Sequence, residues 1–281
     1  MTSSFFNSRL PDTSFRIPCF TWDISQPMLS STPASPAPST SAVERVPSGD
    51  GTALLDNPIF NALLTSHSSL AIPHGQARRY PAEIGPLSGV PDQSAESYRD
   101  LRVLAGSGGI VGLFFDEPPS PPPGWTLLRG GLLDQMISTE AARRAPGLLP
   151  LKAEMRPLTA ADAPLMLDLA TLTEPGPFHL RTIELGAFFG IFHGCQLVAM
   201  AGQRLSLPGF VEVSAVCTHP DARGRGYAAA LMTTVMEDIR ARGKTPILHS
   251  FTSNASAISV YRSLGFKLRR NFHLAVLQCD L

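Results

Sequence analysis

Residues 212–228 read EVSAVCTHPDARGRGYA and contain the strongest local pattern in the chain. The first part alternates in polarity and is rich in valine, which predicts a strand over 210–218. Beyond the glycines of the second part, apolar residues recur every three or four positions up to Ile239, and Gly243 follows. This period predicts a helix over 226–242. A strand is therefore expected to pass through a tight turn directly into the N-terminus of a long helix.

The turn has the composition of an anion-binding site. The first amides of a helix have no acceptor within the helix and carry a partial positive charge. Gly224 and Gly226 would let the main chain approach a diphosphate closely, and Arg223 and Arg225 would add charged donors. The same residues also suit an ordinary turn whose arginines point into water, and the segment by itself leaves that alternative open.

The nicotinamide-dependent enzymes provide one comparison for this turn. Residues 224–229 fit the dinucleotide pattern GxGxxA, which also requires an acidic residue at the end of the next strand to hold a ribose. The next expected strand, over 246–251, ends in serine and phenylalanine, and threonine follows. This reading is therefore the weaker one, and a P-loop is excluded because no GxxxxGK[ST] sequence exists.

The remaining patterns predict a mixed α/β chain in three parts. Residues 1–50 form a Pro/Ser-rich segment expected to be disordered. Residues 51–150 form a smaller α/β region with a helix at 57–64, a strand at 109–115, a strand at 125–128 that can pair with it, and a helix-like LLDQMI at 132–137. Residues 151–281 form the main domain. Its expected strands are 154–156, 187–192, 196–204, 210–218, 247–251 and 272–277, and its expected helices are 159–172, 226–242 and 254–264.

Two expectations concern which side chains face the core. In the helix capped by Thr159, the core face would consist of Leu165, Met166, Leu169 and Leu172. Strict alternation in the strand over 211–218 would place Val211, Val213, Ala215 and Cys217 on one face and Glu212, Ser214, Val216 and Thr218 on the other.

A second segment strengthens the interpretation of the turn. Residues 223–228, RGRGYA, match the [RQ]xxGx[GA] acetyl-CoA motif of the GNAT acyltransferase superfamily, and residues 254–266, NASAISVYRSLGF, resemble its NxxAxxxYxxxGF segment. The resemblance covers residues 151–281. It implies a GNAT-like fold, with a splayed central sheet flanked by helices, that uses acetyl-CoA or another acyl-CoA as co-substrate and no metal.

The resemblance also implies roles for individual residues. The cofactor would contact Val216, Cys217, Thr218, Arg223, Gly224, Arg225, Gly226, Tyr227, Ala228, Asn254 and Tyr261. Tyr261 would protonate the departing thiolate, for which an ordinary pKa near ~10 is suitable. Glu212 would be the general base, and the pantetheine arm would lie between strands 212–218 and 247–251. A core role for Tyr261, an ion pair for Glu212 and a simple helix cap for Asn254 remain open.

Substrate and setting are less constrained. Phe178 is the last residue of the string PGPF and Arg181 follows it. Both could contact the acceptor, Arg181 through a carboxylate, although a surface ion pair fits Arg181 equally. The acceptor is expected to be a small-molecule amine or amino-acid-like compound. Residues 51–150 could be a degenerate half, a lid or a homodimer surface. A CoA-binding regulatory module without turnover is the alternative function.

Composition excludes several partners. Lys+Arg and Asp+Glu are 23 each, so no basic excess favours nucleic acid. No apolar run reaches membrane length and no secretory signal is apparent, so a cytoplasmic protein without membrane contact is expected. Four scattered cysteines suggest neither a zinc site nor a disulfide framework. Cys217 and His219 lack a third, orienting residue for a thiol nucleophile.

Overall fold

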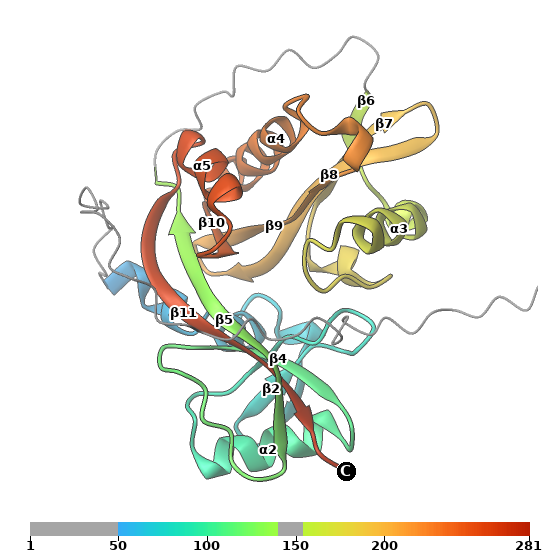
Figure 1. The fold of residues 1–281 in the computed structure, drawn as a ribbon. Coiled ribbons are helices and arrows are strands. Elements are labelled where there is room, and N and C mark those ends of the chain that lie inside the picture. Colours follow the sequence, from blue (N-terminus) through green and yellow to red (C-terminus); the bar gives the residue numbers. More distant parts are fainter. Residues whose placement is uncertain (1–49, 140–153) are drawn as a thin grey trace, which may run out of the picture. The chain divides into compact units, whose positions relative to one another are not determined.

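The computed structural model describes residues 50–139 and 154–281, all within one compact unit (Figure 1). The expectation for the Pro/Ser-rich segment falls, apart from Asp50, outside these residues. Five α-helices are described: α1 (Pro58–Leu64), α2 (Ala95–Ala105), α3 (Ala163–Thr173), α4 (Tyr227–Ala241) and α5 (Ala255–Ser263). Short 3-10 helices occur at η1 (Asp50–Asp56), η2 (Ser68–Leu70), η3 (Ala160–Asp162), η4 (Thr182–Leu185) and η5 (Pro220–Ala222).

An eight-stranded mixed sheet is the centre of the fold. Its order is β4 (Ile110–Phe115), β11 (Lys267–Cys279), β5 (Trp125–Ile137), β10 (Thr245–Phe251), β9 (Phe210–Thr218), β8 (Gln196–Leu207), β7 (Phe188–His193) and β6 (Glu154–Pro157). Every neighbouring pair is antiparallel except β9 and β10, which are parallel. A small second sheet contains β1 (Ile72–His74), β2 (Ala77–Arg79) and β3 (Ser88–Gly89). The predicted mixed α/β fold is confirmed.

Strands from both halves of the sequence share the large sheet. In Figure 1, β5 and β11 run side by side as two long strands, and their register extends from Lys267 opposite Ile137 to Cys279 opposite Trp125. On its other edge β5 pairs with β10. A boundary at residue 150 therefore crosses a continuous sheet, because a strand from 51–150 lies between two strands from 151–281.

This pairing corrects two expectations for β5. The LLDQMI segment is the end of one 13-residue strand, not a helix, and Trp125–Leu128 pairs with β11 instead of β4. All five residues from Leu133 to Ile137 are buried because β5 has strands on both edges and packed side chains on both faces. A short run buried on every side has no diagnostic period, so the sequence cannot distinguish helix from strand there.

The two faces of the sheet have separate cores. In β8, Ala199 and Ala201 belong to the cluster formed with Leu231 and Met232 of α4. Met200, between them, belongs to the cluster formed with α3. Since alternate strand residues point to opposite faces, α4 and α3 cover opposite sides of the sheet.

The core face of α3 differs from the expected one. Met166 and Leu169 are buried, whereas Leu165 and Leu172 are 39% and 54% exposed. Thr159 does form the expected capping box with Asp162, but it caps η3, and the α-helix begins only at Ala163. Met166 and Leu169 are therefore the two of the four predicted residues that face the core.

We expect the difference in burial between Met166 and Leu165 to be measurable as a difference in the free energy of unfolding. Met166→Ala should lower the free energy of unfolding by about 2–5 kcal/mol because it leaves a cavity, and Leu165→Ala should change it by less than about 1 kcal/mol. Urea denaturation of both variants measures the difference. Equal losses would contradict the observed packing of α3.

Candidate functional site

The site is centred where β9 and β10 separate. Their parallel pairing consists of Phe210 with Thr245, Val211 with Pro246, and Glu212 with Ile247, and goes no further. From Val213 onward, the edge of β9 that faces away from β8 has no strand partner among residues 50–139 and 154–281. The separation begins at the start of the segment 212–218 and leaves main-chain hydrogen-bonding groups available along β9.

A β-bulge turns β9 at the same place. Gly202 pairs with Ser214 and Met200 pairs with Cys217, so β9 has one more residue than β8 between the two pairs. Within this bulge, Ala215 has a φ of 51°. The expected alternation is wrong beyond Ser214. Val216 joins the α4 core, while Ala215 and Cys217 join the α3 core. The extra residue at the bulge reverses the faces of every residue after it.

The turn before α4 has the geometry of an anion site. Gly224 and Gly226 have φ values of 74° and 76°, and a Cβ added to either would meet no atom within 4 Å. Gly226 caps α4 without a side-chain hydrogen bond, and its carbonyl accepts from Ala230. The amides of the first helical turn are thus left without intrahelical acceptors.

The side chains around this turn fit the same chemistry. Arg223 and Arg225 are exposed and make only long contacts, each of 3.4 Å, to main-chain carbonyls of Thr218 and Asp221. Thr218 Oγ1 is buried and has no hydrogen-bond partner among the described residues. Tyr227 is buried, and its hydroxyl lies 2.8 Å from Nε2 of His193, which fixes the start of α4 against the end of β7. A coenzyme A diphosphate fits the open turn, with the free amides of α4 as its donors.

The α5 residues contact the α4 core and β10. Asn254 caps α5 by accepting a hydrogen bond from the amide of Ala257. Tyr261 is partly buried against the α4 core. Burial raises the pKa of its phenol, and a hydrogen bond with Ser250 of β10 partly opposes that rise. Tyr261 therefore stays protonated at neutral pH.

Glu212 is not placed like an open general base. Its side chain has no exposed surface. Arg204 donates to both of its oxygens, from Nη2 at 2.6 Å and Nε at 2.8 Å, and His249 Nδ1 lies 2.8 Å from Oε1. Burial alone would raise the pKa of this carboxyl, but the charge of Arg204 and the hydrogen bond from His249 lower it to about 2.

Glu212 belongs to a row of buried polar side chains on five adjacent strands, which we call the polar row: Arg269, Gln135, His249, Glu212 and Arg204. Arg269 Nη1 donates to Gln135 Oε1 at 2.8 Å, and Gln135 Nε2 lies 3.0 Å from both His249 Nε2 and the carbonyl of Leu55. Because Arg269 can only donate, the amide orientation of Gln135 is fixed. His249 Nε2 then accepts, and its Nδ1–H donates to Glu212.

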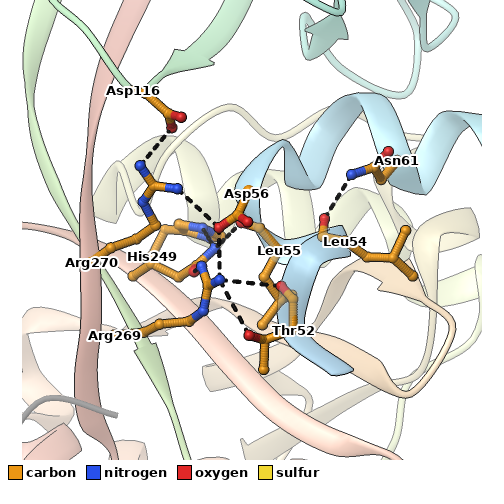
Figure 2. Close-up of polar contacts among 10 residues, drawn as sticks. Thr52, Leu54, Leu55, Asp56, Asn61, Asp116, His249, Arg269 and Arg270 are labelled. Atoms are coloured by element: carbon orange, nitrogen blue, oxygen red, sulfur yellow. Dashed lines mark hydrogen bonds and ion pairs between the residues drawn. The ribbon is translucent and has the colours of Figure 1, made fainter. Parts of the chain in front are cut away.

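The polar row also holds the N-terminal part of the described chain. Figure 2 shows Arg269 donating to Thr52 and to Asp56, the latter at 2.7 Å, while Arg270 contacts Asp56 and Asp116. The side chain of Arg269 is fully buried. Residues of η1 therefore supply the acceptors that a buried guanidinium at the end of the row requires.

Two small cavities adjoin the polar row. One is lined by Phe178, Phe188 and the bulge residues Ser214 and Ala215, the other by Tyr80 and Leu185 among others, and Arg204 lines both. Phe178 is thus at a cavity wall, as a substrate contact would be. Arg181 instead forms an exposed ion pair with Glu184 and lines neither. The sequence analysis missed Arg204, whose only signal was a charge within an otherwise buried strand.

The surroundings of Cys217 and His219 do not suit a catalytic role. Burial raises the pKa of the Cys217 thiol to about 11, and His219 accepts from the amide of Asp221, so the two do not form a nucleophile and base. Within residues 50–139 and 154–281, no cluster of His, Cys, Asp and Glu could hold a metal ion. No helix of these residues is long and apolar enough to cross a membrane.

Comparison with known proteins identifies the family. The model of the FR47-like protein family matches residues 188–274. A solved structure from Novosphingobium aromaticivorans DSM 12444, assigned to the GNAT family of acetyltransferases, is 38% identical, with 81% of this chain and 99% of that chain covered and a TM-score of 0.73. No curated protein matches the sequence.

The chain belongs to the GNAT family. A GCN5-related N-acetyltransferase from Kribbella flavida, at 15% identity, shares the fold, with 79% of this chain and 94% of that chain covered and a TM-score of 0.54. The resemblance seen in the two sequence motifs is thereby confirmed at the level of the family.

The burial of Glu212 predicts a pH-dependent contribution to stability. Its pKa lies below the ordinary 4.5, so its contribution is complete above about pH 4.5 and is lost as the pH falls toward 2. Glu212→Gln should lower the free energy of unfolding by about 3 kcal/mol at pH 7, because it leaves Arg204 without its counter-ion. The difference from the unmodified protein should shrink steadily below pH 4.5.

Glu184→Gln is the matched control, since it removes a carboxylate from an exposed arginine pair. Denaturant unfolding between pH 7 and 3 should show a much smaller effect for this variant. Similar effects for the two variants would contradict the buried pairing of Glu212.

Proposed function

We propose that the protein is an N-acyltransferase that moves an acyl group, in the simplest case acetyl, from acyl-CoA to a primary amine by direct attack. The single observation that carries this proposal is that the pairing of β9 with β10 ends at Glu212 and Ile247. The rest of β9 follows in the chain, and then the turn that leads to the free amides of α4. This arrangement offers a strand edge for the pantetheine amides and a helix N-terminus for the diphosphate, in the order in which coenzyme A presents them. The acetyltransferase names of the structural relatives agree with it.

Each residue of the site has a defined task in this proposal. The main chain of Val216, Cys217 and Thr218 binds the pantetheine arm and donates to the thioester oxygen, where negative charge develops during attack. The turn from Arg223 to Ala228 binds the diphosphate. Asn254 caps α5 and thereby positions Tyr261, whose protonated hydroxyl delivers a proton to the departing thiolate. Holding amine and thioester together supplies most of the rate.

Glu212 takes a different role from the predicted general base. A carboxylate with no exposed surface, both oxygens paired and a pKa of about 2 does not reach the ammonium of an acceptor. We assign it as a positioning residue that holds Arg204 and His249. The acceptor then attacks as the free amine and loses its proton to water.

The full chain tests the activity directly. Acetyl-CoA should raise the melting temperature and NAD should not, and free thiol should appear when a primary amine is added with acetyl-CoA. A chain that binds acetyl-CoA but releases no thiol with any amine would be a CoA-binding module, and the enzyme proposal would be wrong. A shift with NAD equal to that with acetyl-CoA would contradict the proposed ligand.

Substitution at the turn tests the diphosphate site. Gly226→Glu should weaken acetyl-CoA binding at least about 100-fold, because it forces a side chain at positive φ and places a carboxylate against the diphosphate. Gly243→Glu is the control: its φ is 69°, its surroundings are equally open, and it follows the opposite end of α4. Titration calorimetry on both variants decides; equal affinities would refute the assignment.

Removal of one hydroxyl tests the acid. Tyr261→Phe should lower kcat by about 100-fold while the Kd for acetyl-CoA stays within twofold, since only proton delivery is lost. Tyr98→Phe, in α2 at a distance from the site in sequence and core, should leave both unchanged. An unaltered kcat in Tyr261→Phe would remove this residue from the mechanism.

A further inference from the structure

Arg204 occupies a position that the transferase chemistry does not explain. It lies on β8 on the same face as Glu212, opposite α4, and its side chain retains 18% of its exposure. It lines both cavities described above, which also share Pro177 and Thr182.

Half of the Arg204 guanidinium is unused. Glu212 takes Nε–H and one hydrogen of Nη2. Among the described residues Nη1 has no hydrogen-bond partner, and it is not among the fully buried unpaired atoms. The remaining hydrogens of Nη1 and Nη2 lie on the second edge of a planar group, and two parallel donors at this spacing match the two oxygens of a carboxylate.

We propose that Arg204 binds a carboxylate of the acyl acceptor, so that the acceptor is an amino acid or a similarly compact amino carboxylate. The proposal rests on the proposed acyltransferase function. The cavity that Arg204 lines also contacts Ser214 and Ala215, at the bulge where β9 leaves β10. A carboxylate on Arg204 therefore holds the neighbouring amine close to the strand that carries the thioester.

The surroundings favour a carboxylate over other groups. Phe178 and Phe188 make one wall apolar, and no Asp or Glu lines either cavity. Glu212 weakens the attraction for a second anion, but it also fixes the guanidinium in place, so binding costs little side-chain entropy.

The size of the cavities limits the acceptor. The space beside Arg204 is small, with room for about one water molecule in each cavity. A carboxylate therefore requires less widening of the cavity than a larger anionic group such as a phosphate ester. The chain of atoms between the carboxylate and the amine of the acceptor must then be short. An α-amino acid with a small side chain meets both requirements.

The unmodified protein provides the first test. Thiol release from acetyl-CoA is measured with matched pairs that differ only in the carboxylate: glycine and methylamine, L-alanine and ethylamine, L-serine and ethanolamine. At least one amino acid should have a kcat/KM ten or more times that of its partner amine. Amines turned over as well as all the amino acids would overturn this proposal while leaving the acyltransferase intact; release with neither, together with no acetyl-CoA binding, would overturn the proposed function itself.

Variants then assign the effect to Arg204. Arg204→Met alone would leave the buried charge of Glu212 without a counter-ion. The test therefore uses the double variant Arg204→Met/Glu212→Gln, which removes both charges of the pair. A second variant, Arg204→Lys, keeps the positive charge. The double variant should lose at least tenfold more in kcat/KM for the amino acid than for the partner amine, mainly through KM. Arg204→Lys should recover part of the loss.

Acetyl-CoA affinity serves as the fold control, since the turn before α4 contributes no residue to the Arg204 cavities. It should stay within twofold in every variant. Arg99→Met removes an exposed arginine of α2 and should leave the preference for the amino acid unchanged. Loss of activity toward the amine and the amino acid in equal proportion would show a structural role for Arg204 and contradict carboxylate binding.

Discussion

The buried carboxylate of Glu212 is the constraint on which the rest of the site depends. A charged group without exposed surface must be fully paired, and here Arg204 and His249 provide the pairing. Each partner then needs its own partners, which extends the polar row over five strands to Arg269. The polar row determines which way Glu212 points, at the residue where the pairing of β9 with β10 ends. The same contacts hold Arg204 in place while part of its guanidinium remains without a protein partner.

The N-terminal half is part of this arrangement. The carbonyl of Leu55 and the side chain of Asp56 accept from Gln135 and Arg269, so η1 supplies acceptors for side chains that belong to the sheet. Tyr80 of the same half lines one of the cavities beside Arg204. Residues 50–139 thus contribute two strands of the large sheet, acceptors for the polar row and part of a cavity wall.

Elements whose structure depends on neighbouring residues in the chain could be predicted from the sequence. The strand, turn and α4 followed from an apolar period and two glycines, and α5 from its cap and the glycine after it. Gly224 and Gly226 lie in a turn directly before α4, as their sequence predicted. The bulge at Ala215 could not be predicted, because valine, alanine and cysteine fit either face of a strand.

Long-range contacts caused the remaining differences. LLDQMI became a strand through pairing with β10 and β11, and nothing in its composition indicates partners more than a hundred residues away. Arg204 was missed for the same reason, since its meaning comes from Glu212 on the next strand and from cavities built by distant loops. Arg181 was chosen instead because it follows a recognisable string of residues.

The place of β5 within the sheet has a consequence for how the chain is made. On the ribosome this 13-residue strand emerges long before β10 and β11, the two strands that satisfy its edges. Until residues 245–279 have been translated, it presents two rows of unsatisfied amides and carbonyls to other nascent chains. Since such distant partners also slow folding, we expect the protein to acquire its native structure only after residues 245–279 have been synthesised, and to depend on chaperones in the interval.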